Sequence, residues 1–229
     1  MGFRLEVDMI EPVHSWLSSQ VEHVKTEFRT PWGYCDLVGC TLSRRRVSKR
    51  LGLHQRESIG SLEKVDLLWQ VPDEGSGHST DAEKLAACYA PWRDSAVVVE
   101  DIALLEERGF VVRDSKGGLQ KRNGWFPLHK RLIAIEAKLT RVEESMWQAA
   151  RHLAYADESY VALPSRLAWR TLKSRREGEF RQLGIGLLAV TDQAVRVLIK
   201  SRNPSDRDPV LQAHCVERFW RLQVTGNST

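Results

Sequence analysis

The sequence predicts an α/β protein in which a mixed central sheet is flanked by helices and interrupted by an inserted helical subdomain. Three observations predict this class. Short segments with strand-like alternation follow segments of helical periodicity along most of the chain. Residues 131–163 read as strand, helix and strand, and a right-handed crossover of this kind makes the two strands parallel. Residues 43–127 do not resemble a plain connection between strands, so we expect an insert there.

The core is predicted to begin with a helix and a β-hairpin. Residues 5–19 carry an apolar stripe at spacings of three and four, which is typical of an amphipathic helix. Residues 21–29 and 34–42 read as strands, and Pro31-Trp32-Gly33 between them is typical of a turn. Asp36 lies within the second, otherwise apolar strand. An acid at such a position is costly unless it has a partner or a role.

The next core strand is predicted over residues 131–139, where alternate side chains share a face. Ile133, Ile135 and Ala137 therefore point one way, and Glu136 and Lys138 lie together on the other. The Glu-x-Lys triplet alone is weak evidence of a site, because a chain this rich in both residues contains about one by chance. The remaining core elements are predicted as a helix over 141–156, a buried strand over 160–163, a helix over 166–181, strands over 184–190 and 194–199, and a helix over 209–222.

The insert is predicted to contain three helices followed by a hairpin, in the order of a winged-helix module, which it resembles. The helices are expected over 61–71, 81–89 and 95–108, and the hairpin over 110–113 and 119–122. Winged-helix modules often bind DNA through the third helix and the wing. Here the third helix is apolar and acidic, which leaves Lys116, Lys121 and Arg122 on the wing as phosphate-binding candidates. We place the core at 1–42 and 128–229 and the insert at 43–127.

Composition excludes some classes of protein. A chain of 229 residues with 42% hydrophobic residues can fill a real core, and no apolar run approaches the length of a membrane span. The N-terminus lacks the layout of a signal peptide, so a soluble cytoplasmic protein without a membrane partner is expected. The four cysteines are scattered without C-x-x-C spacing, which favours reduced structural thiols over metal ligands.

The net charge of +4 decides little, but its distribution is informative. Basic clusters of this kind track phosphates, or else form solvated helix faces. One cluster lies around residues 166–181. The residues that we predict to bind nucleic acid are Arg44, Arg45, Arg46, Lys49, Arg50, Lys121 and Arg122.

The core elements together resemble the PD-(D/E)XK nuclease superfamily, whose fold is called restriction-endonuclease-like. Three stretches carry the resemblance: "GYCDLVG" around Asp36, "IAIEAKL" at 133–139, and "WQAARHLAYADESYVALP" at 147–164. Cys-Asp replaces the nominal Pro-Asp of the family, which leaves the acid in place. The resemblance covers roughly the first 40 residues and residues 131–164, and the insert and C-terminal third lie outside it.

The resemblance implies a metal-dependent nuclease that hydrolyses DNA. Asp36 and Glu136 would bind Mg²⁺ or Mn²⁺ with the carbonyl of Ala137, since hard oxygen ligands suit these ions. Lys138 would orient the attacking water and offset charge on the phosphate. Three further residues are candidates: Glu11 as the helix acid, Gln148 as a polar helix residue near the metal, and Glu27 as an additional acid on the strand paired with that of Asp36.

Other interpretations stay open at this point. Glu136 and Lys138 can form an exposed ion pair, Asp36 a satisfied turn acid, and Glu11 a partner of the helix dipole. The alternative function is a non-catalytic nucleic-acid-binding or regulatory protein that uses the same fold with a winged-helix insert. A homodimer would be needed to cut both DNA strands symmetrically, but no segment identifies an interface.

Overall fold

The structure, a computed structural model, describes residues 3–125 and 128–226 and divides into two compact units. Unit 1 comprises Met1–Thr41 and His129–Gln212, and unit 2 comprises Leu42–Leu128 and Ala213–Thr229. The division at 41–42 and at 128–129 lies within one residue of the expected limits of the insert, although residues 126 and 127 lie outside the described part. The C-terminal residues 213–229, which we expected in the core, group with unit 2.

Unit 1 is a mixed α/β structure built on a six-stranded sheet with the order β1-β2-β5-β6-β7-β8. The hairpin β1–β2 is antiparallel, β5, β6 and β7 run parallel, and β8 is antiparallel to β7. Its strands are β1 (His23–Thr30), β2 (Gly33–Leu42), β5 (His129–Ala137), β6 (Glu158–Pro164), β7 (Gly186–Val190) and β8 (Val195–Ile199). Its helices are η1 (Glu6–Met9), α1 (Ile10–Ser18), α6 (Val142–His152), α7 (Ser165–Leu172), α8 (Arg176–Leu183) and the start of α9 (Pro209–Gly226).

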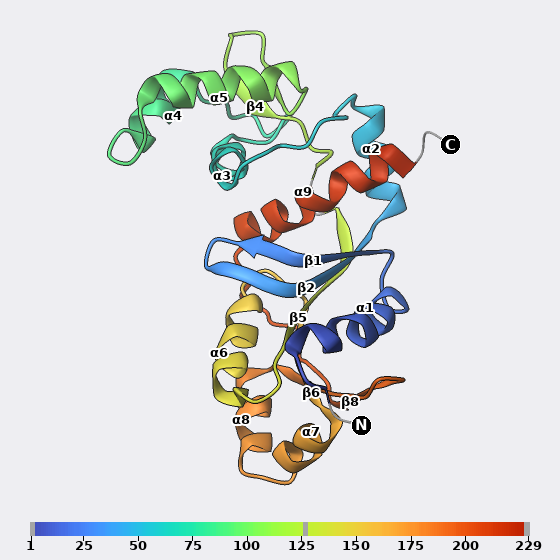
Figure 1. The fold of residues 1–229 in the computed structure, drawn as a ribbon. Coiled ribbons are helices and arrows are strands. Elements are labelled where there is room, and N and C mark those ends of the chain that lie inside the picture. Colours follow the sequence, from blue (N-terminus) through green and yellow to red (C-terminus); the bar gives the residue numbers. More distant parts are fainter. Residues whose placement is uncertain (1–2, 126–127, 227–229) are drawn as a thin grey trace. The chain divides into compact units, whose positions relative to one another are not determined.

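Helices cover both faces of this sheet (Figure 1). One face packs against η1 and α1, whose Met9, Val13 and Leu17 are fully buried. The other face packs against α6, α7 and α8. Alternation along the strands assigns each side chain to a face: Ile135 and Ala137 of β5 belong to the cluster with α1. Glu136, which lies between them, is therefore directed to the face that α6 covers.

Unit 2 contains helices and a separate two-stranded sheet. Its elements are α2 (Arg44–Gly52), α3 (Leu62–Gln70), α4 (Ala82–Tyr89), α5 (Ser95–Glu107), β3 (Val111–Arg113), β4 (Leu119–Lys121) and the end of α9. The β3–β4 pair is antiparallel, and Thr80, in the connection between α3 and α4, bridges to Leu119 of β4. Three helices followed by a hairpin is the element order that the sequence predicts.

The predicted elements agree with the structure closely, with two exceptions. Residues 5–19, which we expected as one helix, form the 3₁₀ helix η1 and the helix α1. The segment 166–181, which we expected as one helix, forms α7 and α8. Between them the Ser174 hydroxyl donates a hydrogen bond to the carbonyl of Thr171 and accepts one from the amide of Arg176. A short polar side chain that bonds to nearby backbone in this way competes with the helix. No helix in the described residues has the length and apolar character needed to cross a membrane.

Candidate active site

Asp36 and Lys138, two of the predicted site residues, lie together where β2 runs beside β5. The backbone amide of Ala137 donates a hydrogen bond of 2.7 Å to Oδ2 of Asp36. The ammonium of Lys138 lies 4.0 Å from the same oxygen. Pairing between β2 and β5 thus brings together two residues that lie about a hundred positions apart in the sequence, as the family resemblance implies.

Lys138 has a second carboxylate partner, Glu6, which the sequence did not indicate. The Lys138 ammonium lies 3.6 Å from Oε2 of Glu6, and the other oxygen of Glu6 accepts a hydrogen bond of 3.3 Å from the amide of Leu139. Glu6 belongs to η1, just before α1. The acid that the N-terminal helical segment brings to the site is therefore Glu6.

Glu136 is buried on the α6 face, with a side chain that is only 1% exposed. Its Oε1 atom lies 2.6 Å from Nε2 of His152, the last residue of α6. The other ring nitrogen of His152 has no hydrogen-bond partner among the described residues. Glu136 thus has two neighbours: the carboxyl group of Asp36 and the buried imidazole of His152.

The electrostatic environment of Asp36 shows that negative charge is crowded at this point. Its pKa is raised from 3.8 to about 6, first by burial and then by repulsion from Glu136. The Ala137 amide and the Lys138 ammonium act in the opposite direction. The two carboxyl groups are also within hydrogen-bonding reach of each other. Two carboxyls this close cannot both ionise without cost, and a bound cation would remove that cost.

Cys35, the residue before Asp36, is fully buried beside Glu136. Burial raises the pKa of its thiol well above the ordinary value, and the charge of Glu136 adds to the shift. The ligand atoms of Cys35, Glu136 and His152 all lie within 4.8 Å of one another. These three residues, which we call the inner cluster, place sulfur, oxygen and nitrogen donors around one point.

The remaining predicted acids and Gln148 are placed differently. Glu11 is exposed on α1, where the Ser15 hydroxyl donates to it at 3.5 Å, and no contact joins it to Asp36 or Lys138 among the described interactions. Glu27 occupies the position across from Asp36 in the β1–β2 register and has a φ of 46°, in a region that non-glycine residues rarely adopt. Gln148 lies on α6, and its buried Oε1 has no hydrogen-bond partner within the described chain.

The predicted nucleic-acid-binding residues fall into two groups. Arg44, Arg45 and Lys49 are exposed on α2, and Arg46 and Arg122 are partly exposed. Arg50 is fully buried and paired with Glu217, so its side chain is not accessible to a phosphate.

Lys121 is also buried, with its ammonium 3.4 Å from Asp73. It lies 5.7 Å from the ring of Trp69 and 5.9 Å from that of Trp125. The prediction that Arg50 and Lys121 contact DNA is therefore wrong for this structure. The prediction assumed that basic residues in a charged run are exposed. The periodicity of helix α2 directs Arg50 inward, and that of strand β4 directs Lys121 inward.

Three residues at the site were missed: Glu6, Cys35 and His152. The burial of His152 could have been predicted from the sequence, because His152 lies three residues after Ala149 and so continues the inward-facing stripe of α6. For Cys35 the only signal in the sequence was its position beside Asp36. The scattered spacing of the cysteines favoured structural thiols instead. For Glu6 no periodicity or motif indicated contact with Lys138, since that contact depends on how η1 packs.

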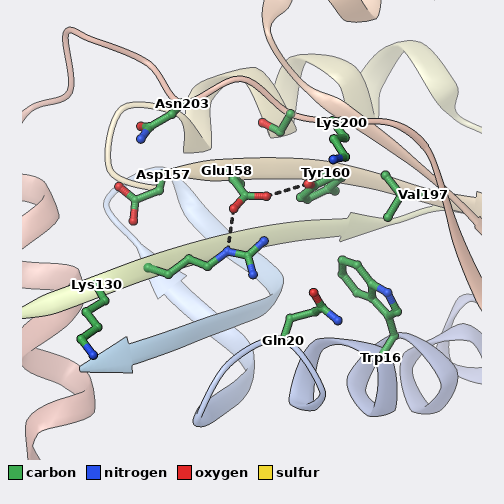
Figure 2. Close-up of a pocket in the computed structure, with 11 residues that line it drawn as sticks. Trp16, Gln20, Lys130, Asp157, Glu158, Tyr160, Val197, Lys200 and Asn203 are labelled. Carbon is green, nitrogen blue, oxygen red and sulfur yellow. Dashed lines mark hydrogen bonds and ion pairs between the residues drawn. The ribbon is translucent and has the colours of Figure 1, made fainter. Parts of the chain in front are cut away.

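A separate pocket of about 570 Å³ lies at the other end of the parallel strands, and Figure 2 shows its lining. Arg131 of β5 contacts Glu158 of β6 at 2.6 Å, and the Tyr160 hydroxyl donates to the same carboxylate at 2.6 Å. Arg131 and Glu136 are five residues apart, which is roughly 16 Å along a strand. The pocket is therefore distinct from the Asp36 site, and none of the predicted catalytic residues lines it.

Comparison with known proteins gave no match: no family model matches the chain, and neither curated proteins nor solved structures gave a significant match.

Proposed function

We propose that the protein is a metal-dependent nuclease that hydrolyses phosphodiester bonds of DNA. The observation that carries the proposal is the gathering of Asp36, Glu136 and Lys138 at the junction of β2 and β5. Two carboxyls and an ammonium from distant parts of the chain form the set of groups that the sequence resemblance implies. Such a set is suited to phosphoryl chemistry, because it joins hard oxygen ligands to a positive charge.

The residues present fit a divalent cation such as Mg²⁺ or Mn²⁺. Asp36 and Glu136 supply hard oxygen donors, and the pKa of Asp36 is raised first by burial and then by the charge of Glu136, which a bound cation would offset. Gln148 remains a proposed further oxygen ligand from α6, since its Oε1 atom is buried and has no hydrogen-bond partner in the described chain. When bound, the metal ion would polarise a phosphoryl oxygen and lower the pKa of a coordinated water. The Ala137 carbonyl remains a proposed additional ligand.

Lys138 has an electrostatic role in this proposal. Its ammonium lies 4.0 Å from Asp36 and 3.6 Å from Glu6, so two carboxylates hold the positive charge at the sheet edge. A fixed positive charge at that position stabilises negative charge as it develops on a phosphate. Glu6 acts as a positioning residue, because it also accepts the amide hydrogen bond of Leu139.

The order of elements in unit 1 supports the restriction-endonuclease-like fold. Helix α1, the antiparallel hairpin β1–β2, strand β5, helix α6 and the parallel strand β6 follow one another, as the resemblance implies. In unit 2, helices α3 to α5 followed by a hairpin support a winged-helix-like insert. The exposed cations Arg44, Arg45 and Lys49 on α2 support DNA as the polymer, since basic side chains bind its phosphates.

One observation favours the alternative, a non-catalytic nucleic-acid-binding protein with the same fold. Glu136 is almost completely buried and its Oε1 bonds to His152, so this oxygen is turned toward the interior. A carboxylate held this way contributes to the site only through its second oxygen or after a side-chain rotation. The alternative predicts salt-sensitive DNA binding that substitution of Asp36 or Glu136 leaves unchanged.

The test is cleavage of single-stranded, duplex and branched DNA, with RNA in parallel, across a titration of Mg²⁺ and Mn²⁺. We expect cation-dependent cleavage that falls at least about 100-fold in Asp36→Asn, Glu136→Gln and Lys138→Met, as on removal of a group that stabilises the transition state. Glu143→Gln removes an exposed acid from α6 and is the matched control. Cleavage that survives Asp36→Asn would sink the proposal. DNA binding without cleavage in every condition would favour the alternative.

A further inference from the structure

The inner cluster differs in chemistry from the carboxylate pair that the proposed hydrolysis uses. Its donors come from three elements: Cys35 from β2, Glu136 from β5 and His152 from α6. All three side chains are buried, and their ligand atoms lie within 4.8 Å of one another. Ions such as Mg²⁺ favour oxygen donors alone, whereas a thiolate, an imidazole and a carboxylate together suit Zn²⁺.

We propose that Cys35, Glu136 and His152 form a binding site for a thiophilic divalent cation of the Zn²⁺ class. Zinc bonds of about 2.0–2.3 Å place tetrahedral ligand atoms roughly 3.3–3.8 Å apart. The three donors lie within 4.8 Å of one another, so the widest pair must close by about 1 Å, whereas Oε1 of Glu136 and Nε2 of His152, now 2.6 Å apart, must separate by about 1 Å to admit the ion. Three protein ligands leave the fourth tetrahedral position for a water molecule. The site does not depend on the proposed hydrolysis of DNA.

Charge balance supports this choice of ion. On binding, the Cys35 thiol loses its proton to solvent and a sulfur–metal bond forms. One thiolate, one carboxylate and a neutral imidazole then carry two negative charges, which equal the charge of Zn²⁺. A neutral assembly suits a buried position, where an uncompensated charge is expensive. Without a cation, the Cys35 thiol donates to the carbonyls of Leu37 and Ile135, and the Glu136 carboxylate bonds to the His152 imidazole.

Glu136 belongs both to this cluster and to the proposed Asp36 site, so a cation bound in the inner cluster affects the Asp36 site. With a zinc-class ion bound, the Glu136 carboxylate is held toward Cys35 and His152, on the interior side. If the hydrolytic proposal also holds, Zn²⁺ and Mg²⁺ compete for this carboxylate and Zn²⁺ inhibits cleavage. If the hydrolytic proposal fails, the inner site remains as a structural metal site.

The test uses the full chain, stripped with a chelator, returned to reducing buffer and titrated with Co²⁺ as a spectroscopic substitute for Zn²⁺. We expect one equivalent of Co²⁺ to give the visible bands of a tetrahedral ion and a near-ultraviolet thiolate-to-cobalt charge-transfer band. Added Zn²⁺ should abolish both signals by displacement. Cys35→Ser should remove the charge-transfer band. Cys40→Ser, which changes another buried cysteine of the same strand, should retain it.

A second measurement covers the case in which Cys35→Ser does not fold, as judged by circular dichroism. Loss of a group that only supports a ligand lowers metal affinity about 10- to 100-fold, so loss of the ligand itself in His152→Gln should lower Zn²⁺ affinity at least about 100-fold. Competition with a chromophoric chelator measures this affinity. Absence of a charge-transfer band in the folded wild-type chain overturns the proposal. A band that persists in Cys35→Ser, or that Cys40→Ser also removes, overturns it too.

Discussion

At the scale of single residues, Lys138 lies between two carboxylates that come from different elements. Asp36 approaches from β2 and Glu6 from η1, each within 4.0 Å of the ammonium. A flexible four-carbon side chain is positioned mainly by such partners, since its own rotamer entropy opposes order. Glu6 therefore fixes the direction of the charge that the proposed chemistry requires.

The first prediction compares Glu6 with Glu11. Glu6→Gln should lower cleavage about 10- to 100-fold, the usual cost of removing a group that orients a functional side chain. Glu11→Gln should have little effect, because Glu11 is exposed and its described hydrogen bond is to Ser15. Cleavage rates at saturating Mg²⁺ measure both variants. Equal losses in the two variants would contradict the placement of Glu6.

The second prediction concerns pH and Asp157, the residue just before β6. Burial acts to raise the pKa of this carboxyl, but His129, the amide of Leu132 and Arg207 outweigh it and hold the pKa below the ordinary value. A lowered folded-state pKa gives stability that is present above the unfolded pKa of 3.8 and lost as pH falls through the folded value. Acid should therefore weaken the start of β6.

Asp157→Asn should cost about 1.5–3 kcal/mol at neutral pH, the range for hydrogen bonds to a charged group. The difference from wild type should shrink as pH falls below about 4. Urea unfolding at a series of pH values measures it. A penalty that is the same at neutral and acid pH would show that packing, and not charge, accounts for the loss.

Residue patterns predicted only part of the site. Strand alternation placed Glu136 beside Lys138, but the resemblance to the nuclease superfamily was needed to group them with Asp36, which the structure places beside Lys138. His152 and Cys35 were missed because their donor atoms converge from separate elements, a relation that spacing along the chain does not encode. The contact of Glu6 depends on a 3₁₀ turn, and such short turns carry no periodic signal.

At the scale of elements, α2 separates an exposed basic face from a buried charge. Arg44, Arg45 and Lys49 are exposed, whereas Arg50 inserts beneath them with 0% exposure. The Arg50 guanidinium pairs with both oxygens of Glu217 and stacks 3.9 Å from the ring of Trp220. Adjacent residues of α2 thus have opposite environments: Lys49 is exposed to solvent, and Arg50 is buried.

The third prediction uses this contrast. Arg50→Met should destabilise unit 2 by about 3–5 kcal/mol, because it leaves the Glu217 charge buried without its partner. Lys49→Met should change stability by no more than about 0.5 kcal/mol, as is usual at exposed positions. If α2 binds DNA, the Lys49 variant should reduce the salt slope of binding by about 1. Thermal unfolding and DNA titrations at several salt concentrations measure the two effects.

The elements themselves were predictable because periodicity and turn residues agreed. The hairpin β1–β2 has its turn at Pro31-Trp32-Gly33, and β6 ends at Pro164, both marked in the sequence. The break between α7 and α8 was not marked, since no glycine or proline lies there. A serine that bonds to the surrounding backbone is a weaker signal, because most serines in helices do not end them.

At the scale of the whole molecule, the chain passes between the two units three times, after residues 41, 128 and 212. Unit 2 is therefore an insert that the C-terminal residues complete. Glu217 and Trp220 both lie in this returning segment, and both contact Arg50. The sequence predicted the two inner boundaries, but the final crossing lies within α9, where one helical pattern runs on without a break.

The fourth prediction follows from this topology. A chain that ends at Gln212 should lose the fold of unit 2, because Arg50 then has neither Glu217 nor Trp220. The sheet of unit 1 should remain. Hydrogen exchange should show lost protection over α2 to β4 and retained protection over β5 to β7. Glu217→Gln, which keeps the shape and removes the charge, should give a smaller loss of protection confined to unit 2. Retained protection of α2 in the truncated chain would contradict the prediction.

The distance in sequence between Arg50 and Glu217 also sets an order of events during synthesis. The two residues are 167 positions apart, so at about 5–20 residues per second Arg50 leaves the ribosome roughly 10–30 s before its partner. All strands of the unit 1 sheet, which ends with β8 at Ile199, are made before Glu217 appears. The sheet can thus assemble while unit 2 is still incomplete. During that interval Arg50 has neither Glu217 nor Trp220 to pack against.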